Sequence, residues 1–244
     1  MKIALIGYGS MGKTIEEVCK RKGHEIVLIL DEKRPASWKK DLKNADVAIE
    51  FTTPEAAEAN MLECFKAGVP VVTGTTGWYQ RFEEVKDACE DLEGGLFYAT
   101  NFSIGVNLFF QLNRILSRIM ATHHEYQARI HEEHHLRKKD APSGTAISIA
   151  EGIIAEHPAY IRWAMPDKSL EGDLEISSLR DGDIPGTHEI FYRSADDEIS
   201  IKHQAFGRKG FAEGAVVAAE FLASKRRGIY TMSDLINVTE PHGL

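Results

Sequence analysis

KIALIGYGSMG, residues 2–12, begins as an apolar run and continues into a loop with three glycines. The run, residues 2–6, shows no polar alternation, which predicts a strand buried on both faces, as in a parallel sheet. Gly7, Gly9 and Gly12 have the spacing G-x-G-x-x-G. Glycines so placed permit a tight turn and let the backbone approach a pyrophosphate, which the N–H groups of the following helix would bind. The stretch therefore predicts the start of a dinucleotide-binding domain.

The rest of the first hundred residues alternates between strand and helix patterns. One expected helix has Pro54 near its start and Gly68 just past its end, as helices often do. Strands are predicted over residues 24–31, 46–54 and 96–102, and a strand followed by a turn over residues 69–77. Helices are predicted over residues 11–23, 54–68 and 79–95. Such alternation indicates a Rossmann-like α/β domain with a parallel sheet and right-handed crossovers.

An acidic residue at the end of the second expected strand supports the dinucleotide interpretation. Asp31 lies nineteen residues past Gly12 and would accept hydrogen bonds from the adenosine ribose. Lys33 and Arg34 follow it, and they suit either a solvated turn or the 2′-phosphate of NADP. The choice between NADH and NADPH therefore stays open. The alternative without a cofactor is a glycine-rich turn in a flavodoxin-like domain.

Two further loops follow expected strands at the same edge of the sheet. They are GTTG, residues 74–77 (the GTT loop), and ATNFS, residues 99–103. Ligands of open parallel sheets bind beyond the carboxyl ends of the strands. The small hydroxyl and amide side chains of these loops suit a nicotinamide and its ribose, although each loop alone is also ordinary turn chemistry.

Composition narrows the class of protein. The chain has 244 residues, of which 43% are hydrophobic and 27% charged, as in ordinary globular proteins. Its net charge of −8 argues against a nucleic-acid partner. The three cysteines, an odd number at wide spacing, fit reduced thiols in the cytoplasm. No apolar window is long enough to span a membrane, so a cytoplasmic protein without a membrane partner is expected.

The second half of the chain has a different pattern. A strongly apolar helix is expected over residues 106–120, and alternating strands follow. The strands are predicted over residues 125–133, 174–183, 186–194 and 197–206, and two final helices over residues 211–228 and 230–236. This order predicts an α+β domain with a mixed or antiparallel sheet. We expect a first domain of residues 1–103 and 210–244, and a second of residues 104–209.

HEEHH, residues 131–135, satisfies the zinc-protease pattern H-E-x-x-H. That pattern needs a helix, because only there do residues four apart share a face. Residues 126–130 instead alternate between apolar and polar, which predicts a strand running into the histidines. His131 and His135 would then not converge on an ion, and no metal is expected.

PSGTA, residues 142–146, predicts the start of a helix. Ser143 is a suitable N-cap, and the exposed N–H groups of Gly144 and Thr145 form a site for a carboxylate. The helix dipole adds only ~0.3–1 kcal/mol, so binding needs a cation as well. Lys138 lies in the preceding loop. The stretch therefore indicates a site for an anionic substrate that receives a proton, and the alternative is a solvated basic loop.

EEHHLRKKDAPSGTA, residues 132–146, resembles the signature E-x-H-H-x-x-K-x-D-A-P-S-G-T-A of the 4-hydroxy-tetrahydrodipicolinate reductase (dihydrodipicolinate reductase) family. The resemblance extends over the whole chain, through GYGSMG, TGTTG, ATNFSIGVN and FAEGAV. It implies NADH- or NADPH-dependent reduction of a small cyclic dicarboxylate in the diaminopimelate branch of lysine biosynthesis. It also implies a homotetramer formed largely through the sheet of the second domain.

The resemblance also implies roles for individual residues. His134 would be the proton donor and acceptor, and Lys138 a second donor. The substrate would contact His135, Ser143, Gly144 and Thr145. The dinucleotide would contact Gly7, Tyr8, Gly9, Ser10, Met11, Gly12, Asp31, Gly74, Thr75, Thr76, Ala99, Thr100, Asn101 and Phe102. The alternatives are another two-domain dehydrogenase, acting on an amino acid or sugar, and a dinucleotide-binding regulator without turnover.

Overall fold

The structure is a computed structural model that describes residues 1–31, 35 and 37–236. The chain divides into two compact units, Met1–Ile104 with Arg208–Leu244, and Gly105–Gly207. Within the described residues, none of the helices has the length and apolar character needed to cross a bilayer.

The first unit contains a parallel sheet, as predicted. Its strands are β1 (Lys2–Ile6), β2 (Glu25–Leu30), β3 (Val47–Glu50), β4 (Val71–Thr73), β5 (Gly95–Tyr98) and β11 (Gly228–Tyr230). The order is β11-β5-β4-β3-β1-β2, and every pairing is parallel. The sequence did not predict β11, because three residues are too few to show a period. The helix expected over residues 230–236 begins only after this strand.

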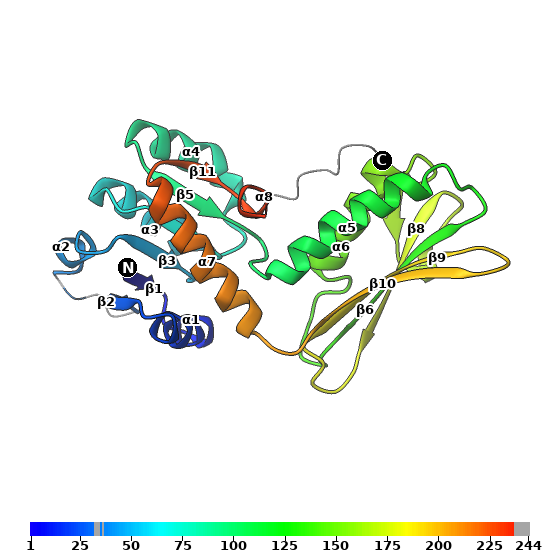
Figure 1. The fold of residues 1–244 in the computed structure, drawn as a ribbon, viewed down its shortest axis with the longest axis horizontal. Coiled ribbons are helices and arrows are strands. Elements are labelled where there is room, and N and C mark those ends of the chain that lie inside the picture. The colour runs from blue at the N-terminus through cyan, green and yellow to red at the C-terminus, as the bar shows by residue number, and fades with distance from the viewer. Residues whose placement is uncertain (32–34, 36, 237–244) are drawn as a thin grey trace. The chain divides into compact units, whose positions relative to one another are not determined.

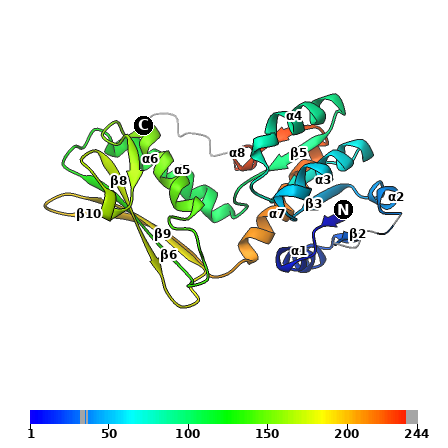
Figure 2. The same cartoon turned by 180° about the vertical axis from the view of Figure 1, so that it is seen from behind.

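Helices cover both faces of this sheet (Figures 1 and 2). They are α1 (Ser10–Arg21), α2 (Trp38–Leu42), α3 (Pro54–Ala67), the 3-10 turn η1 (Tyr79–Arg81), α4 (Phe82–Asp91), α7 (Lys209–Lys225) and α8 (Met232–Leu235). Ile3 and Leu5 of β1 pack with α1 and α7, whereas Ala4 and Ile6 pack with α3 and α4. The strand is therefore apolar throughout because both of its faces are buried.

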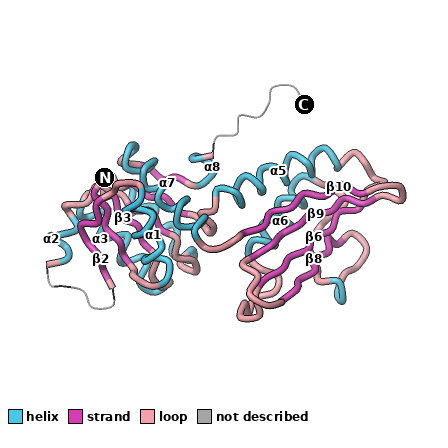
Figure 3. The backbone as a smooth tube through the Cα atoms, turned by 60° about the horizontal axis from the view of Figure 1, so that its bottom comes forward, coloured by secondary structure: helices cyan, strands magenta, loops and turns pink. Residues whose placement is uncertain are grey.

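The second unit contains a mixed sheet, with two helices on one face (Figure 3). Its strands are β6 (Gln127–His134), β7 (Arg162–Ala164), β8 (Asp173–Arg180), β9 (Gly186–Arg193) and β10 (Glu198–Ala205), and its helices are α5 (Ile104–Met120), α6 (Gly144–Glu156) and the 3-10 turn η2 (Pro166–Lys168). The order is β10-β9-β6-β8-β7, antiparallel from β10 to β6 and parallel from β6 to β7. Of the two sheet types that the sequence predicted, the structure therefore has the mixed one.

Alternation along β6 determines which side chains face the helices. Ala128 and Ile130 pack into the core of this unit with α5 and α6. Glu132 and His134 continue the same buried row, so the inward face of the strand changes from apolar to polar toward its end. The polar end of β6 lies next to the start of α6, since the N–H of Ser143 donates to Glu132.

Candidate active site

The first unit brings the predicted cofactor residues to one edge of its sheet. Gly7 to Gly9 connect β1 to α1, Ser10 to Gly12 form the first turn of α1, Asp31 follows β2, Gly74 to Thr76 follow β4, and Ala99 to Phe102 follow β5. These loops leave the carboxyl ends of parallel strands, where ligands of such sheets bind. Lys33 and Arg34, the candidates for a 2′-phosphate contact, lie outside the described residues.

The glycines of the first loop have distinct physical roles. Gly7 has φ +96°, and a Cβ there would lie 1.9 Å from the carbonyl oxygen of Phe51. A Cβ on Gly12 would lie 2.2 Å from the carbonyl oxygen of Gly7. Gly9 differs, because a Cβ there would meet nothing within 4 Å, and it caps α1 without a side chain. The open space before a helix N-terminus fits the pyrophosphate of a dinucleotide.

A buried glutamate that sequence reasoning missed supports the GTT loop. Glu50, at the end of β3, is fully buried and accepts hydrogen bonds from Thr73 Oγ1 (2.6 Å) and Thr75 Oγ1 (3.1 Å). Thr75 Oγ1 also accepts the N–H of Thr52 (2.8 Å). The side chain of Thr75 therefore ties two neighbouring loops together. An acid that ends an apolar strand was the signal for Glu50 in the sequence.

The loop after β5 is held by close packing with α7. Phe102 is buried, with its ring centroid 5.9 Å from that of Phe97, and Asn101 Oδ1 accepts the N–H of Ser103 (2.9 Å). A Cβ on Gly214 would lie 1.7 Å from the carbonyl oxygen of Phe102. The glycine in FAEGAV thus allows α7 to approach the loop.

The register of the second sheet assembles a polar cluster from three strands. In the strand register, Glu132 lies opposite His188 of β9 and Ser178 of β8. His134 lies opposite Arg180 of β8. Sequence reasoning missed His188 and Arg180. The signal for His188 was its place in an alternating strand, on the same face as two apolar residues.

Glu132 is the centre of this cluster and is fully buried. Its Oε1 accepts hydrogen bonds from Arg180 Nη2 (2.8 Å), Ser178 Oγ (2.8 Å) and the N–H of Ser143 (3.0 Å). Burial alone would raise the pKa of Glu132, but the nearby His134 and the hydrogen bonds from Ser143, Arg180 and Ser178 outweigh it and hold the pKa well below its usual range. Glu132 is therefore ionised at neutral pH.

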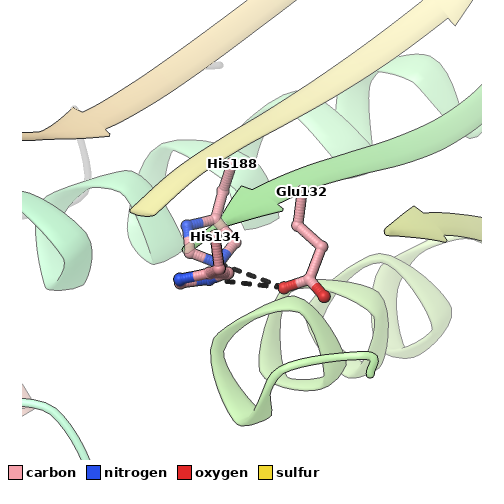
Figure 4. Close-up of side chains that lie close together, drawn as sticks. All are labelled: Glu132, His134 and His188. Carbon is pink, nitrogen blue, oxygen red and sulfur yellow. Dashed lines mark hydrogen bonds and ion pairs between the residues drawn. The ribbon is translucent and has the colours of Figure 1, made fainter. Parts of the chain in front are cut away.

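The second oxygen of Glu132 faces two histidines (Figure 4). Oε2 lies 3.5 Å from His134 Nε2 and 3.7 Å from His188 Nε2, and the two nitrogens are 3.4 Å apart. Burial, and secondly the charge of His134, lowers the pKa of His188 to about 4, so that its ring is neutral at neutral pH. A Cβ on Gly186 would lie 2.8 Å from His134 Cε1, so this glycine lets the ring lie against β9.

The start of α6 borders the same cluster. Ser143 is the N-cap, as predicted, and its Oγ accepts the N–H of Ala146 (3.2 Å). The same Oγ lies 3.2 Å from His188 Nε2. Gly144 and Thr145 form the first turn, and a Cβ on Gly144 would meet nothing within 4 Å. The N-terminus of α6 is thus next to the histidines and has open space at Gly144.

Lys138 and His135 lie in the loop between β6 and α6. Lys138 Nζ forms an ion pair with Asp140 (2.7 Å), and the carbonyl oxygen of Asp140 accepts a hydrogen bond from Arg180 (2.5 Å). This chain of contacts links Lys138 to Glu132. His135 Nδ1 is buried without a hydrogen-bond partner among the described residues.

The two histidines that define the H-E-x-x-H pattern, His131 and His135, do not lie on one face of a helix. The first four residues of the pattern lie in β6, which confirms the predicted strand. His131 points away from the Glu132 side of the strand, and its Nδ1 lies 2.8 Å from Ser177 Oγ.

Comparison with known proteins gives the class of this chain. The C-terminal model of dihydrodipicolinate reductase matches residues 105–236, and the N-terminal model matches residues 1–102. Such proteins are NAD(P)H-dependent oxidoreductases, and the fold of the first unit agrees with that class. The chain belongs to the dihydrodipicolinate reductase family, as its signature stretch predicted.

Individual relatives cover nearly the whole chain. The 4-hydroxy-tetrahydrodipicolinate reductase of Christiangramia forsetii is 44% identical over 97% of this chain and 98% of its own length. The enzyme of the same name from Rickettsia bellii is 39% identical over 93% of this chain and 90% of its own length. The dipicolinate-bound dihydrodipicolinate reductase from Paenisporosarcina sp. TG-14 has a similar fold, with a TM-score of 0.76, 23% identity, and coverage of 97% of this chain and 99% of that one.

Proposed function

We propose that the protein reduces 4-hydroxy-tetrahydrodipicolinate to tetrahydrodipicolinate with NADH or NADPH, in the diaminopimelate branch of lysine biosynthesis. The observation that carries the proposal is a histidine, His134, placed beside an ionised glutamate and the open N-terminus of α6. A proton donor next to a carboxylate-binding helix end suits the reduction of an unsaturated dicarboxylate.

The first unit would hold the dinucleotide through the loops that follow β1, β2, β4 and β5. The backbone at Gly9 and the N–H groups of Ser10 to Gly12 would bind the pyrophosphate, and Asp31 would bind the adenosine ribose. When bound, the cofactor supplies the hydride.

The N-terminus of α6 would bind a substrate carboxylate through Ser143, Gly144 and Thr145. The helix dipole contributes only ~0.3–1 kcal/mol, so a cation is needed as well. Lys138 is suited to this, because a substrate carboxylate could share its ammonium group with Asp140. His135 follows His134 directly and would contact the same substrate.

His134 would supply the proton from its imidazole ring. The carboxylate of Glu132 lies 3.5 Å from His134 Nε2 and accepts hydrogen bonds from Arg180 and Ser178 on its other oxygen. Glu132 and Gly186 also fix the position of the ring. Lys138 would act as a second donor near the bound carboxylate.

We also propose that four copies assemble through the outward face of the five-stranded sheet. Leu179 of β8 alternates with the inward residues of its strand and is 44% exposed. Sedimentation equilibrium of the purified chain measures the number of copies, and a monomer would contradict this assembly.

The test of the reaction is an assay that generates the substrate from aspartate semialdehyde and pyruvate with the preceding synthase. We expect oxidation of the nicotinamide cofactor only when this substrate is present. Oxidation driven instead by an amino acid or sugar would indicate another dehydrogenase. Cofactor binding without any turnover would indicate a regulator.

The role of Asp31 is tested with the two cofactors side by side. A carboxylate that binds ribose hydroxyls repels a 2′-phosphate, so Asp31→Ala should weaken NADH binding more than NADPH binding. Fluorescence titration of each cofactor measures the two affinities. Equal losses would show that Asp31 does not contact the ribose.

A further inference from the structure

Three donor atoms of the second unit have an unusual mutual spacing. Glu132 Oε2, His134 Nε2 and His188 Nε2 are separated by 3.5, 3.7 and 3.4 Å (Figure 4). Good N–H···O hydrogen bonds measure about 2.7–3.2 Å, so these contacts are too long to be strong ones. Zinc bonds of about 2.0–2.1 Å in a tetrahedral arrangement place ligand atoms roughly 3.3–3.4 Å apart. The three atoms are therefore spaced like one face of a coordination tetrahedron.

The same atoms are chemically suited to a cation. Two imidazole nitrogens and one carboxylate oxygen are a common ligand set for zinc in proteins. Oε2 of Glu132 is buried and accepts no hydrogen bond from the described residues. Glu132, His134 and His188 are 0%, 9% and 4% exposed, so water would compete little for a bound ion. An orphaned carboxylate oxygen beside two imidazole nitrogens is costly to bury, and a cation would satisfy it.

We propose that Glu132, His134 and His188 bind Zn²⁺ or a similar divalent transition-metal ion reversibly, and that the bound ion inhibits the enzyme. Inhibition follows because the ion occupies the imidazole nitrogen of His134 that faces Glu132. This second part rests on the proposed function, since it assumes that His134 takes part in proton transfer. Binding of the ion does not depend on it.

Arg180 limits how tightly this site holds a metal ion. Its guanidinium donates to Oε1 of Glu132 and so withdraws negative charge from the carboxylate. Oε2 remains available, because Arg180 and the ion would use different oxygens. Ser143 Oγ, 3.2 Å from His188 Nε2, borders the position of a fourth ligand. We therefore expect weaker binding than at a closed four-ligand zinc site, and removal by a chelator.

The first test uses Co²⁺ as a spectroscopic probe on the full chain, after treatment with a chelator. A four- or five-coordinate cobalt site gives visible absorption bands that cobalt in water does not. We expect these bands to saturate at one equivalent and Zn²⁺ to abolish them. His188→Asn should weaken cobalt binding at least tenfold. His131→Asn is the matched control, because His131 belongs to the same histidine-rich stretch but faces Ser177.

Thermal unfolding with and without Zn²⁺ tests the same site in a second way, in case a variant in the cobalt experiment folds poorly. Zn²⁺ should raise the thermal midpoint of the wild-type protein, since a ligand that binds only the folded state stabilises it. His134→Asn, at the end of its strand, should lose this shift, and His131→Asn should keep it. The site is overturned by absent cobalt bands in the wild type, or by equal losses in the His131 and His188 variants.

Inhibition is tested separately with the reductase assay. Zn²⁺ should inhibit turnover competitively with the dicarboxylate and not with the cofactor, and a chelator should restore it. Full turnover with one equivalent of cobalt bound would overturn the inhibitory role. An inactive protein that still gives the cobalt bands would contradict the proposed function and support the metal site.

Discussion

Two glutamates, one in each unit, are fully buried, but they have different hydrogen-bond partners. Glu50 ends β3, and its oxygens accept hydrogen bonds from neutral groups, among them the hydroxyls of Thr73 and Thr75. Glu132 lies near the end of β6, and a guanidinium, that of Arg180, donates to one of its oxygens. The other oxygen of Glu132 accepts no hydrogen bond and faces two histidines.

The difference shows how to tell a structural carboxylate from a functional one. Both oxygens of Glu50 have donors, so the residue holds loops together and offers nothing to a ligand. Glu132 is saturated on one side only, and its free oxygen lies among titratable groups. Buried polar atoms normally have partners, so an exception in such a cluster indicates chemistry.

The largest effect is expected at the histidine that Glu132 faces. General-acid catalysis is typically worth about 10²–10⁴-fold, or roughly 2.7–5.4 kcal/mol of barrier. His134→Gln should lower turnover by that factor and leave cofactor affinity nearly unchanged, as steady-state kinetics and cofactor titration would measure. His131→Gln is the control, since it lies on the other face of the strand. Full activity of His134→Gln would remove His134 from the mechanism.

Removal of the Glu132 carboxylate should cost stability as well as activity. Glu132→Ala leaves the guanidinium of Arg180 without its buried partner. Breaking a buried ion pair in this way costs about 3–5 kcal/mol. Denaturant unfolding measures the loss, and a loss below about 1 kcal/mol would mean that Glu132 is not held as the structure indicates.

The pH dependence of stability gives an independent check. Burial alone would raise the pKa of Glu132, but its hydrogen bonds hold it below the ordinary value of 4.5. The folded protein therefore binds fewer protons here than the unfolded chain. The contribution is present above pH 4.5 and is lost as the pH falls further. In Glu132→Gln, this part of the acid-induced loss of stability should disappear.

Sequence alone predicted the first unit better than the cluster around Glu132. The glycine loop and Asp31 are local signals, because their spacing along the chain reflects one strand, one turn and one helix. Ser143 was predicted as an N-cap for the same reason. His188 and Arg180 reach Glu132 only through the register of three strands, which no short stretch encodes. Alternation along its strand could have placed His188 on an inward face but could not have identified its partner.

Replacement of Glu50, whose hydrogen-bond partners are neutral, should have a smaller effect on stability. In Glu50→Gln, an NH₂ group must replace one oxygen, so one of the threonine hydroxyls loses its acceptor. A buried donor left without an acceptor lowers the free energy of unfolding by about 1–3 kcal/mol. Cofactor affinity should also fall, because Thr75 then holds the GTT loop less firmly. Turnover at saturating cofactor should stay near the wild-type value. A larger loss of turnover than in Glu132→Ala would reverse the assignment of the two glutamates.

The smallest effect on stability is expected for an exposed arginine–carboxylate pair of the same length. Arg137 Nη1 lies 2.8 Å from Asp183, the same distance as between Arg180 and Glu132. The side chains of Arg137 and Asp183 are 74% and 82% exposed, so water screens the pair. Exposed pairs contribute about 0.2–1 kcal/mol, and less at high salt. Arg137→Ala should therefore unfold at nearly the wild-type denaturant concentration, and added NaCl should remove any remaining difference. A loss as large as that of Glu132→Ala would show that distance, and not burial, governs these pairs.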